Sequence, residues 1–140
     1  MAKLVLTSLE KALKSLEKVL HVLERLSGPQ LALKTELRDS AIQRFEYSYE
    51  LCFKFIKRQL EQMSPHPSEL DEVSFRDLLR RAGEAGLVRE VEAFMRYRQA
   101  RNLTIHAYEE EKAEEVYALL PGFLKEAQFL LAQLKKRNAS

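Results

Sequence analysis

The sequence has 140 residues, of which 46% are hydrophobic and 31% are charged, values typical of one globular domain that buries its own core. The net charge of +2 gives no strong positive field, so any RNA binding would have to use a local patch. The single cysteine, Cys52, excludes an internal disulfide, and no apolar run is long enough for a membrane span or a secretory signal. We therefore expect one domain over residues 1–140, in a cytoplasmic protein with no membrane partner.

The first predicted helix covers Ser8–Leu26. Its leucines recur at alternating spacings of four and three, the pattern of helices that pack in bundles: Leu9, Leu13, Leu16, Leu20 and Leu23. Thr7 and Glu10 have the spacing of a capping box, and the run Ser27-Gly28-Pro29 should end the helix. His21 lies off the leucine stripe, so we expect it in solvent.

The second predicted helix covers Glu36–Met63 and is rich in aromatic residues. Its expected apolar face consists of Leu37, Ala41, Phe45, Cys52, Phe53, Ile56 and Leu60. The aromatic residues exceed what one stripe requires, which leaves two interpretations open: a wide core face, or partial contact with a second subunit. Arg44 and Glu46 flank Phe45 and are the polar residues expected to point inward.

The rest of the chain predicts two further helices. Two prolines in Ser64–Ser68 end the second helix and place His66 in a loop. A third helix capped by Ser74 should run in two pieces, Phe75–Ala82 and Val88–Asn102, because glycines interrupt it between them.

A fourth helix should begin near Glu109–Glu111, where acidic residues suit a helix N-terminus, and run through Leu134. Pro121 should kink this helix without ending it, because the apolar spacing resumes in register. No strand signals appear. The sequence therefore predicts an all-α fold: an antiparallel up-and-down four-helix bundle with a broken third helix and a Pro-kinked fourth helix.

The stretch from residue 98 to residue 108 gathers two guanidiniums, an imidazole, an amide, a hydroxyl and a phenol. On an ideal helix Arg101 and His106 would lie about 140° apart, so they share a side only if the backbone changes direction between them. The β-branched pair Thr104-Ile105 weakens helix locally. We therefore predict a helix end and a turn here, capped by Asn102 or Thr104, with the two side chains converging on a pocket for a phosphoryl group.

Two runs of the sequence resemble the HEPN-domain family, in particular its HepT-like branch and that branch's nucleotidyltransferase substrate-binding proteins. Gln43–Leu51 is similar to the family's RFE(F/Y)(T/S)YEL run, and Arg101–Tyr108 is similar to its RNLTSHTY run, with the signature Arg-x4-His-x-Tyr. The resemblance covers about Leu4–Leu134. Phe94 stands where the family commonly has tryptophan, and Ile105 where it commonly has serine.

The resemblance implies a helical bundle that forms at least a dimer, with two Arg-His motifs near the subunit cleft. It also implies a separately encoded minimal nucleotidyltransferase of the MNT type as partner, often in a toxin–antitoxin pair. In the better-defined members the HEPN protein is a metal-independent endoribonuclease, and the nucleotidyltransferase silences it by attaching AMP to the motif tyrosine, here Tyr108.

The chemistry of these residues agrees with what the resemblance implies. The pKa of histidine, about 6.5, suits His106 as general base or acid, and the planar guanidinium of Arg101 can bind two phosphate oxygens. Asn102 and Thr104 would serve as positioning donors, and Arg98 would extend the basic patch. One histidine per chain cannot serve as base and acid together, which favours two motifs in one cleft. No metal-ligand spacing surrounds His106, so we expect neither metal nor cofactor.

Three functions remain open from the sequence. The preferred one is a substrate-binding partner subunit of a nucleotidyltransferase that binds nucleotide at the Arg-x4-His-x-Tyr cleft. The alternative is an active endoribonuclease that uses Arg101 and His106 on RNA and is silenced at Tyr108. The third is an inactive dimeric scaffold, which the replacement of serine by Ile105 leaves open.

Overall fold

The computed structural model describes residues 3–139, and every regular element in that range is helical. The long helices are α1 (Thr7–Glu24), α2 (Lys34–Met63), α3 (Phe75–Glu84), α4 (Val91–Leu103) and α5 (Glu110–Arg137). Three short 3-10 helices join them: η1 (Gly28–Leu33), η2 (Pro67–Asp71) and η3 (Thr104–His106). The predicted all-α bundle is confirmed, and α3 and α4 are the two pieces of its broken third helix.

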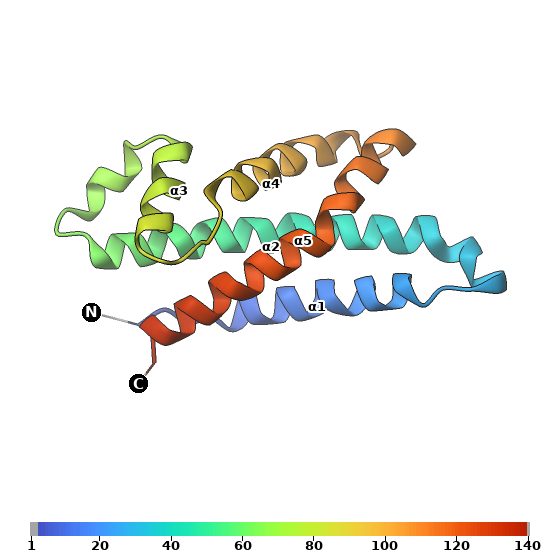
Figure 1. Cartoon of the computed structure of the whole chain (residues 1–140), viewed down its shortest axis with the longest axis horizontal. Helices are drawn as coiled ribbons and strands as arrows, with labels where there is room; N and C mark the ends of the chain where they lie inside the picture. Colours follow the sequence, from blue (N-terminus) through green and yellow to red (C-terminus); the bar gives the residue numbers. More distant parts are fainter. Residues whose placement is uncertain (1–2, 140) are drawn as a thin grey trace.

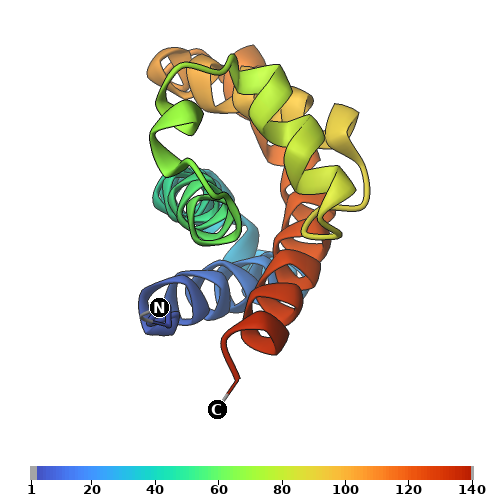
Figure 2. The same cartoon turned by 90° about the vertical axis from the view of Figure 1, so that its left-hand side faces the viewer.

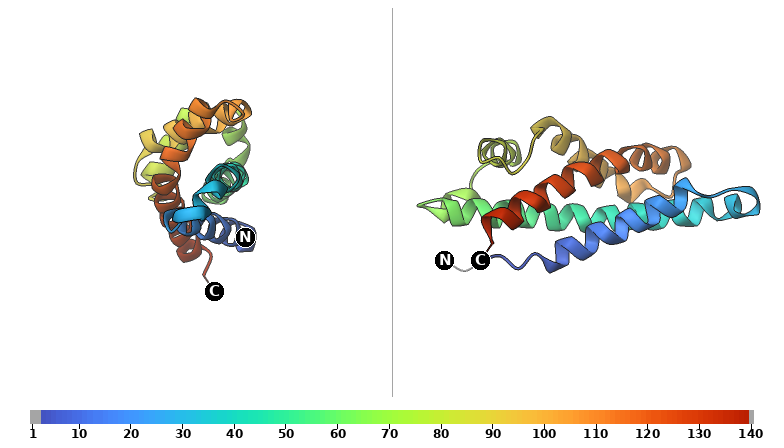
Figure 3. Two further views of the ribbon diagram at one scale, coloured as in Figure 1. Left: turned by 90° about the vertical axis from the view of Figure 1, so that its right-hand side faces the viewer. Right: turned by 60° about the horizontal axis from the view of Figure 1, so that its bottom comes forward.

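The long helix α2 lies at the centre of the arrangement. It runs antiparallel to α1, while α5 crosses both and α4 returns along the opposite side of α2 (Figure 1). Viewed along the bundle, α1, α5 and the α3–α4 pair form an arc around three sides of α2 (Figure 2). The two ends of the described chain meet at one end of the bundle, where the Leu4 amide donates to Asn138 Oδ1 at 2.9 Å (Figure 3).

A chain of aromatic rings joins three helices in the core. Phe45 of α2 packs edge-on against Phe123 of α5, with ring centroids 4.9 Å apart, and Phe123 packs edge-on against Tyr97 of α4 at 5.3 Å. Each such pair stabilises by about 0.5–1.5 kcal/mol beyond the burial of its surface. The cluster fixes α4 against α2 just before the turn that follows α4.

The excess of aromatic residues on α2 is accounted for within one chain. Phe45, Tyr49 and Phe55 are buried, Phe53 stacks on Phe75 of α3 with centroids 5.3 Å apart, and the Tyr47 hydroxyl hydrogen-bonds Ser15 Oγ at 2.8 Å. Of the two interpretations, a wide core face therefore suffices. Leu37 and Phe53 of the predicted face are only partly buried, and their places in the core are taken by Ile42, Tyr49 and Phe55.

Arg44 and Glu46 were expected to point into the core, but neither does. Both are half-buried, and the Arg44 guanidinium donates to the Ser15 carbonyl at 2.7 Å. The fully buried polar residues of α2 are instead Arg38, Ser48 and Gln59.

Of the two N-terminal helix caps predicted from the sequence, one is confirmed and one is wrong. The Ser74 hydroxyl accepts the Asp77 amide at 3.1 Å, which confirms that cap. The predicted capping box at Thr7 and Glu10 is wrong, because Thr7 is already helical and no side chain caps α1. Gly86, with φ of +78°, allows the turn that separates α3 from α4.

Pro121 lies inside α5, which stays continuous on both sides of it. The prediction that the fourth helix passes through this proline is confirmed, and the ribbon of α5 bends between its orange and red parts (Figure 1). Within residues 3–139, no helix has both the length and the apolar character that crossing a membrane requires.

Candidate functional site

The α-helix ends between Arg101 and His106, as predicted. The helix α4 ends at Leu103 and passes directly into η3. Thr104 is the buried residue at this junction: its hydroxyl donates to the Arg101 carbonyl at 2.7 Å and accepts from Arg101 Nη1 at 3.1 Å. Of the two predicted caps, Thr104 therefore closes the helix end, while Asn102 is exposed.

The Arg101 guanidinium lies between two carboxylates of α2. Its Nε donates to Glu50 Oε1 at 3.0 Å, and its Nη1 lies 3.6 Å from Glu46 Oε2. Glu46 and Glu50 are four residues apart and therefore share a helix face. In the described part of the chain Nη2 has no partner, so two N–H donors remain for a ligand.

His106 and Tyr108 form the outer part of the site. His106 Nδ1 lies 3.7 Å from Glu109 Oε2, a separation that becomes an ion pair when the imidazole is protonated. The His106 and Tyr108 rings are 6.2 Å apart at their centroids, and Tyr108 is 82% exposed. Among residues 3–139 no polar contact joins Arg101 to His106, so their convergence on a shared pocket stays a prediction.

Arg98 lies apart from this group. Its guanidinium stacks over the Phe75 ring of α3, 4.1 Å from the ring centroid, which holds it on the α3 side of α4. Both arginines are close to Tyr49: burial raises the pKa of the Tyr49 phenol, and the fields of Arg98 and Arg101 act in the opposite direction.

Sequence reasoning missed Arg38, the most buried charged residue of the site region. Its side chain is enclosed, with the residue 4% exposed, and Nη1 lies 2.6 Å from Glu110 Oε1 and 3.4 Å from Glu114 Oε2. The Glu110 hydrogen bond raises the pKa of the Arg38 guanidinium and, in return, lowers the pKa of the Glu110 carboxyl. Arg38 thus fastens the first turn of α5, two residues after Tyr108, to α2.

A signal for Arg38 was present in the sequence. It continues the buried stripe of Ala41, Phe45 and Ser48 at spacings of three, four and three. An arginine on such a stripe needs buried or nearby carboxylates, and the acidic run at the start of the last helix supplies them.

An open pocket lies directly beside the turn. Its volume is about 350 Å³, and its lining consists of Asp39, Ile42, Gln43 and Glu46 from α2 and Ala107 and Tyr108 from the turn. Glu46 belongs to this pocket and also faces Arg101, so the pocket and the guanidinium share one carboxylate.

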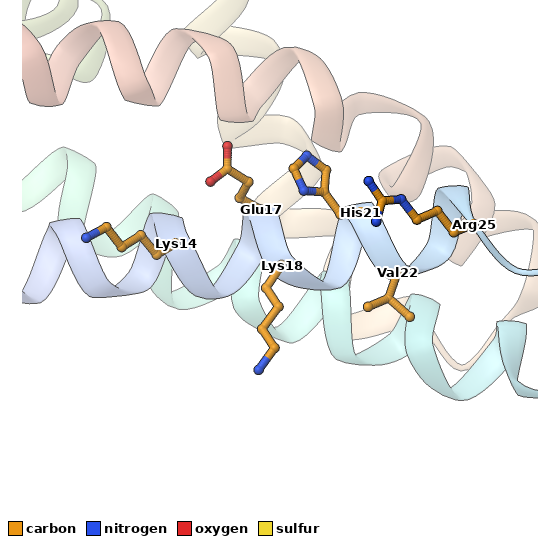
Figure 4. A pocket seen from close by; sticks show the side chains of 6 residues that line it. All are labelled: Lys14, Glu17, Lys18, His21, Val22 and Arg25. Carbon is orange, nitrogen blue, oxygen red and sulfur yellow. The ribbon is translucent and has the colours of Figure 1, made fainter.

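A second hollow lies on α1, far along the sequence from the motif, and is lined by Lys14, Glu17, Lys18, His21, Val22 and Arg25. Five of the six residues belong to α1 and Arg25 is its C-cap, and Lys18 and Val22 point away from His21 and Arg25 (Figure 4). This hollow is the outer face of a helix, and His21 is exposed there as predicted. No three His, Cys, Asp or Glu side chains of residues 3–139 are grouped so as to hold a metal ion.

The chain is similar to known proteins over almost its whole length. The family described as nucleotidyltransferase substrate binding protein like matches residues 4–136. A Haemophilus influenzae protein named Probable ribonuclease HepT is 41% identical over 140 residues, which cover 97% of this chain and 95% of that protein.

Two solved structures share the fold. One, described as the substrate-binding domain of a nucleotidyltransferase from Haemophilus influenzae, is 36% identical with a TM-score of 0.84 and covers 94% of this chain and 99% of its own. The other, from Thermus thermophilus, is 30% identical with a TM-score of 0.67 and covers 91% of this chain and 98% of its own. Together with the match over residues 4–136, these likenesses show that the chain belongs to the family of nucleotidyltransferase substrate-binding-like proteins.

Proposed function

We propose that this chain is the substrate-binding partner subunit of a small, separately encoded nucleotidyltransferase, and that the turn after α4 binds a nucleotide phosphate. One observation carries the proposal. Thr104 and Glu50 hold Arg101 in place at a helix end, with the two N–H groups of Nη2 left for an anion, beside a half-exposed imidazole and an exposed phenol. A planar guanidinium with paired donors suits phosphate oxygens.

The motif residues take distinct roles in this proposal. Arg101 binds the phosphate, and the exposed Asn102 amide supplies a further donor. Thr104 acts through Arg101, because both hydrogen-bonding directions of its hydroxyl are already used there. Arg98 adds positive charge next to the site without reaching the same ligand atoms, since it is stacked on Phe75.

Tyr108 is the proposed acceptor of AMP. Its side chain is 82% exposed, so a second protein can reach its hydroxyl. AMP on this oxygen would bring a phosphate beside His106 and Arg101 and occupy the cleft, which is how one half of a toxin–antitoxin pair would silence the other.

The experiment mixes the purified chain with its cognate nucleotidyltransferase, ATP and Mg²⁺ and measures the intact mass. We expect at least one added AMP, none with Tyr108→Phe, and full addition with Tyr47→Phe, a matched exposed tyrosine on α2. AMP on Tyr108→Phe at the wild-type level would overturn the assignment of the acceptor. Failure of the two proteins to form a complex would overturn the partner-subunit function.

A second candidate is a metal-independent endoribonuclease. The name of the relative that is 41% identical, Probable ribonuclease HepT, favours it. In this function His106 exchanges the proton and Arg101 stabilises the charge on the phosphate in the transition state. The third candidate, a scaffold without activity, is supported by the replacement of a family serine by Ile105, which removes a hydroxyl beside the histidine.

A further inference from the structure

We infer that the pocket beside Tyr108 binds the ribonucleoside part of the nucleotide whose phosphate Arg101 holds. The inference rests on the proposed function and extends it, because the pocket is built from residues of α2 that the Arg-x4-His-x-Tyr motif does not include. It assigns a binding role to Gln43 and names ribose and base as the groups recognised.

The shape of the pocket suits one nucleoside. Asp39, Gln43 and Glu46 follow one another at spacings of four and three, so they form one wall along the exposed face of α2. The buried side chain of Ile42 forms an apolar floor, and Tyr108 stands on the side of the turn. A volume of about 350 Å³ is at the lower end of the range for small-molecule sites, enough for one nucleoside and too little for several.

The charge of the lining excludes phosphate from the pocket itself. Asp39 and Glu46 repel an anion but accept hydrogen bonds from ribose hydroxyls or from an exocyclic amine. Gln43 offers a donor and an acceptor together, the combination that reads the edge of adenine, and within residues 3–139 no hydrogen bond occupies its amide. The exposed Tyr108 ring supplies a face on which a base can stack.

The shared carboxylate fixes the orientation of the ligand. Glu46 lines the pocket and lies 3.6 Å from Arg101, so the guanidinium marks the phosphate end and the pocket the nucleoside end. The far end is held by Arg38, whose Nη2 lies 3.3 Å from Asp39 Oδ1. The same guanidinium binds Glu110, two residues after Tyr108. The α2 side and the turn side of the pocket are therefore both connected to the buried Arg38.

A ribonucleoside phosphate can reach this pocket as a free nucleotide or as part of an RNA strand, and the chemistry recognised is the same. The experiment titrates the purified full chain with AMP, 2′-deoxy-AMP, the trinucleotide ApApA and inorganic phosphate, by calorimetry. We expect AMP to bind at least fivefold more tightly than 2′-deoxy-AMP or inorganic phosphate. Tighter binding of ApApA than of AMP assigns the site to RNA, and the reverse order assigns it to free nucleotide.

The variant Gln43→Leu separates the pocket from the phosphate site. It replaces the amide with an apolar branched group on an exposed helix position, and we expect it to weaken AMP or ApApA at least fivefold while leaving inorganic phosphate unchanged. The matched control is Gln128→Leu, an exposed glutamine of α5 whose polar contact is Glu17. Equal affinity of AMP and 2′-deoxy-AMP, or no effect of Gln43→Leu on either ligand, would overturn the inference.

The measurements distinguish a wrong assignment of the pocket from a wrong proposed function. If Gln43→Leu has no effect and Arg101→Ala still weakens inorganic phosphate, the pocket assignment is wrong and the phosphate site stands. Complex formation with the nucleotidyltransferase and AMP addition to Tyr108 are measured on the chain with Gln43 unchanged, so they test the proposed function separately.

Discussion

Arg101 carries the positive charge at the site. Its guanidinium is the one cation that faces Glu46 and Glu50 within residues 3–139, so these three side chains together carry a net negative charge. Both carboxylates are partly in solvent, and ion pairs of this kind contribute only about 0–1 kcal/mol. Neither pair occupies Nη2, so an incoming phosphate can bind there while Glu50 still holds Nε, and binding should weaken as salt is raised.

His106 is the residue that separates an enzyme from a binding subunit. If the chain cleaves RNA without divalent metal, His106→Ala should reduce the cleavage rate by about 10²- to 10⁴-fold, because a general acid or base contributes about that factor. The assay measures cleavage of a structured RNA in the presence of EDTA. His66→Ala, which changes an exposed loop histidine, is the matched control. Wild-type activity in His106→Ala would remove the histidine from the mechanism.

Part of the site could be predicted from the sequence. The turn between Arg101 and His106 followed from the angle between them on a helix and from the β-branched pair at 104 and 105. The carboxylates around Arg101 could not be predicted from the sequence, because their pairing depends on which face of α2 meets the end of α4. That is a property of tertiary packing, as is the pocket in which Tyr108 and Gln43 share a lining.

At the scale of elements, the turn that carries His106 and Tyr108 is fixed at both ends. Thr104 closes α4 before it, and the Arg38–Glu110 pair fastens α5 after it. Arg38 is enclosed, while its carboxylate partners Asp39, Glu110 and Glu114 remain largely in solvent. The guanidinium therefore depends on the carboxylates, because an unpaired buried charge is strongly destabilising.

The Arg38–Glu110 pair predicts how stability depends on pH. The hydrogen bond from Arg38 lowers the pKa of the Glu110 carboxyl below its ordinary value of 4.5. The pair therefore stabilises the fold fully above that value and loses its contribution as the pH falls through the lowered pKa. Thermal unfolding of Glu110→Gln should show a lower midpoint than wild type at pH 7, and the difference should shrink in acid.

Glu111→Gln is the control for this pH dependence. It removes an acidic residue from the same exposed first turn of α5 but leaves the Arg38 contacts intact. Its midpoint should stay close to wild type at both neutral and acid pH. A destabilisation of Glu110→Gln that is equally large at about pH 3, below the ordinary range of glutamate, would mean that packing of the side chain, rather than its charge, holds α5.

The helices themselves followed from apolar periodicity, which predicted α1, α2, α5 and the two-piece third helix with ends close to those observed. The short helices η1 and η2 were missed, because they bury almost no apolar surface and so leave no periodic signal. Thr7 was assigned as a cap from spacing alone, although α1 already begins at that residue and Glu10 pairs with Lys14 at 3.8 Å.

At the scale of the whole molecule, the site is open on its outer side. Ile105 is 71% exposed next to the exposed Tyr108, an unusual place for a β-branched apolar side chain and an aromatic one. One chain also supplies one His106, whereas cleavage of RNA calls for a base and an acid. Both features fit the dimer that the family resemblance implies, in which a second copy would bring its own motif to the same cleft.

A dimer with this contact would make a charge at residue 105 unfavourable, which can be tested. Burying an isoleucine stabilises by about 1.5–3 kcal/mol, so Ile105→Lys should raise the dimer dissociation constant by at least about tenfold. Sedimentation equilibrium over a range of concentrations measures it. Val5→Lys is the matched control, since Val5 is 77% exposed near the N-terminus and far along the chain from the motif. A dissociation constant unchanged by Ile105→Lys would place the subunit contact on another face, and each motif would then have to work alone.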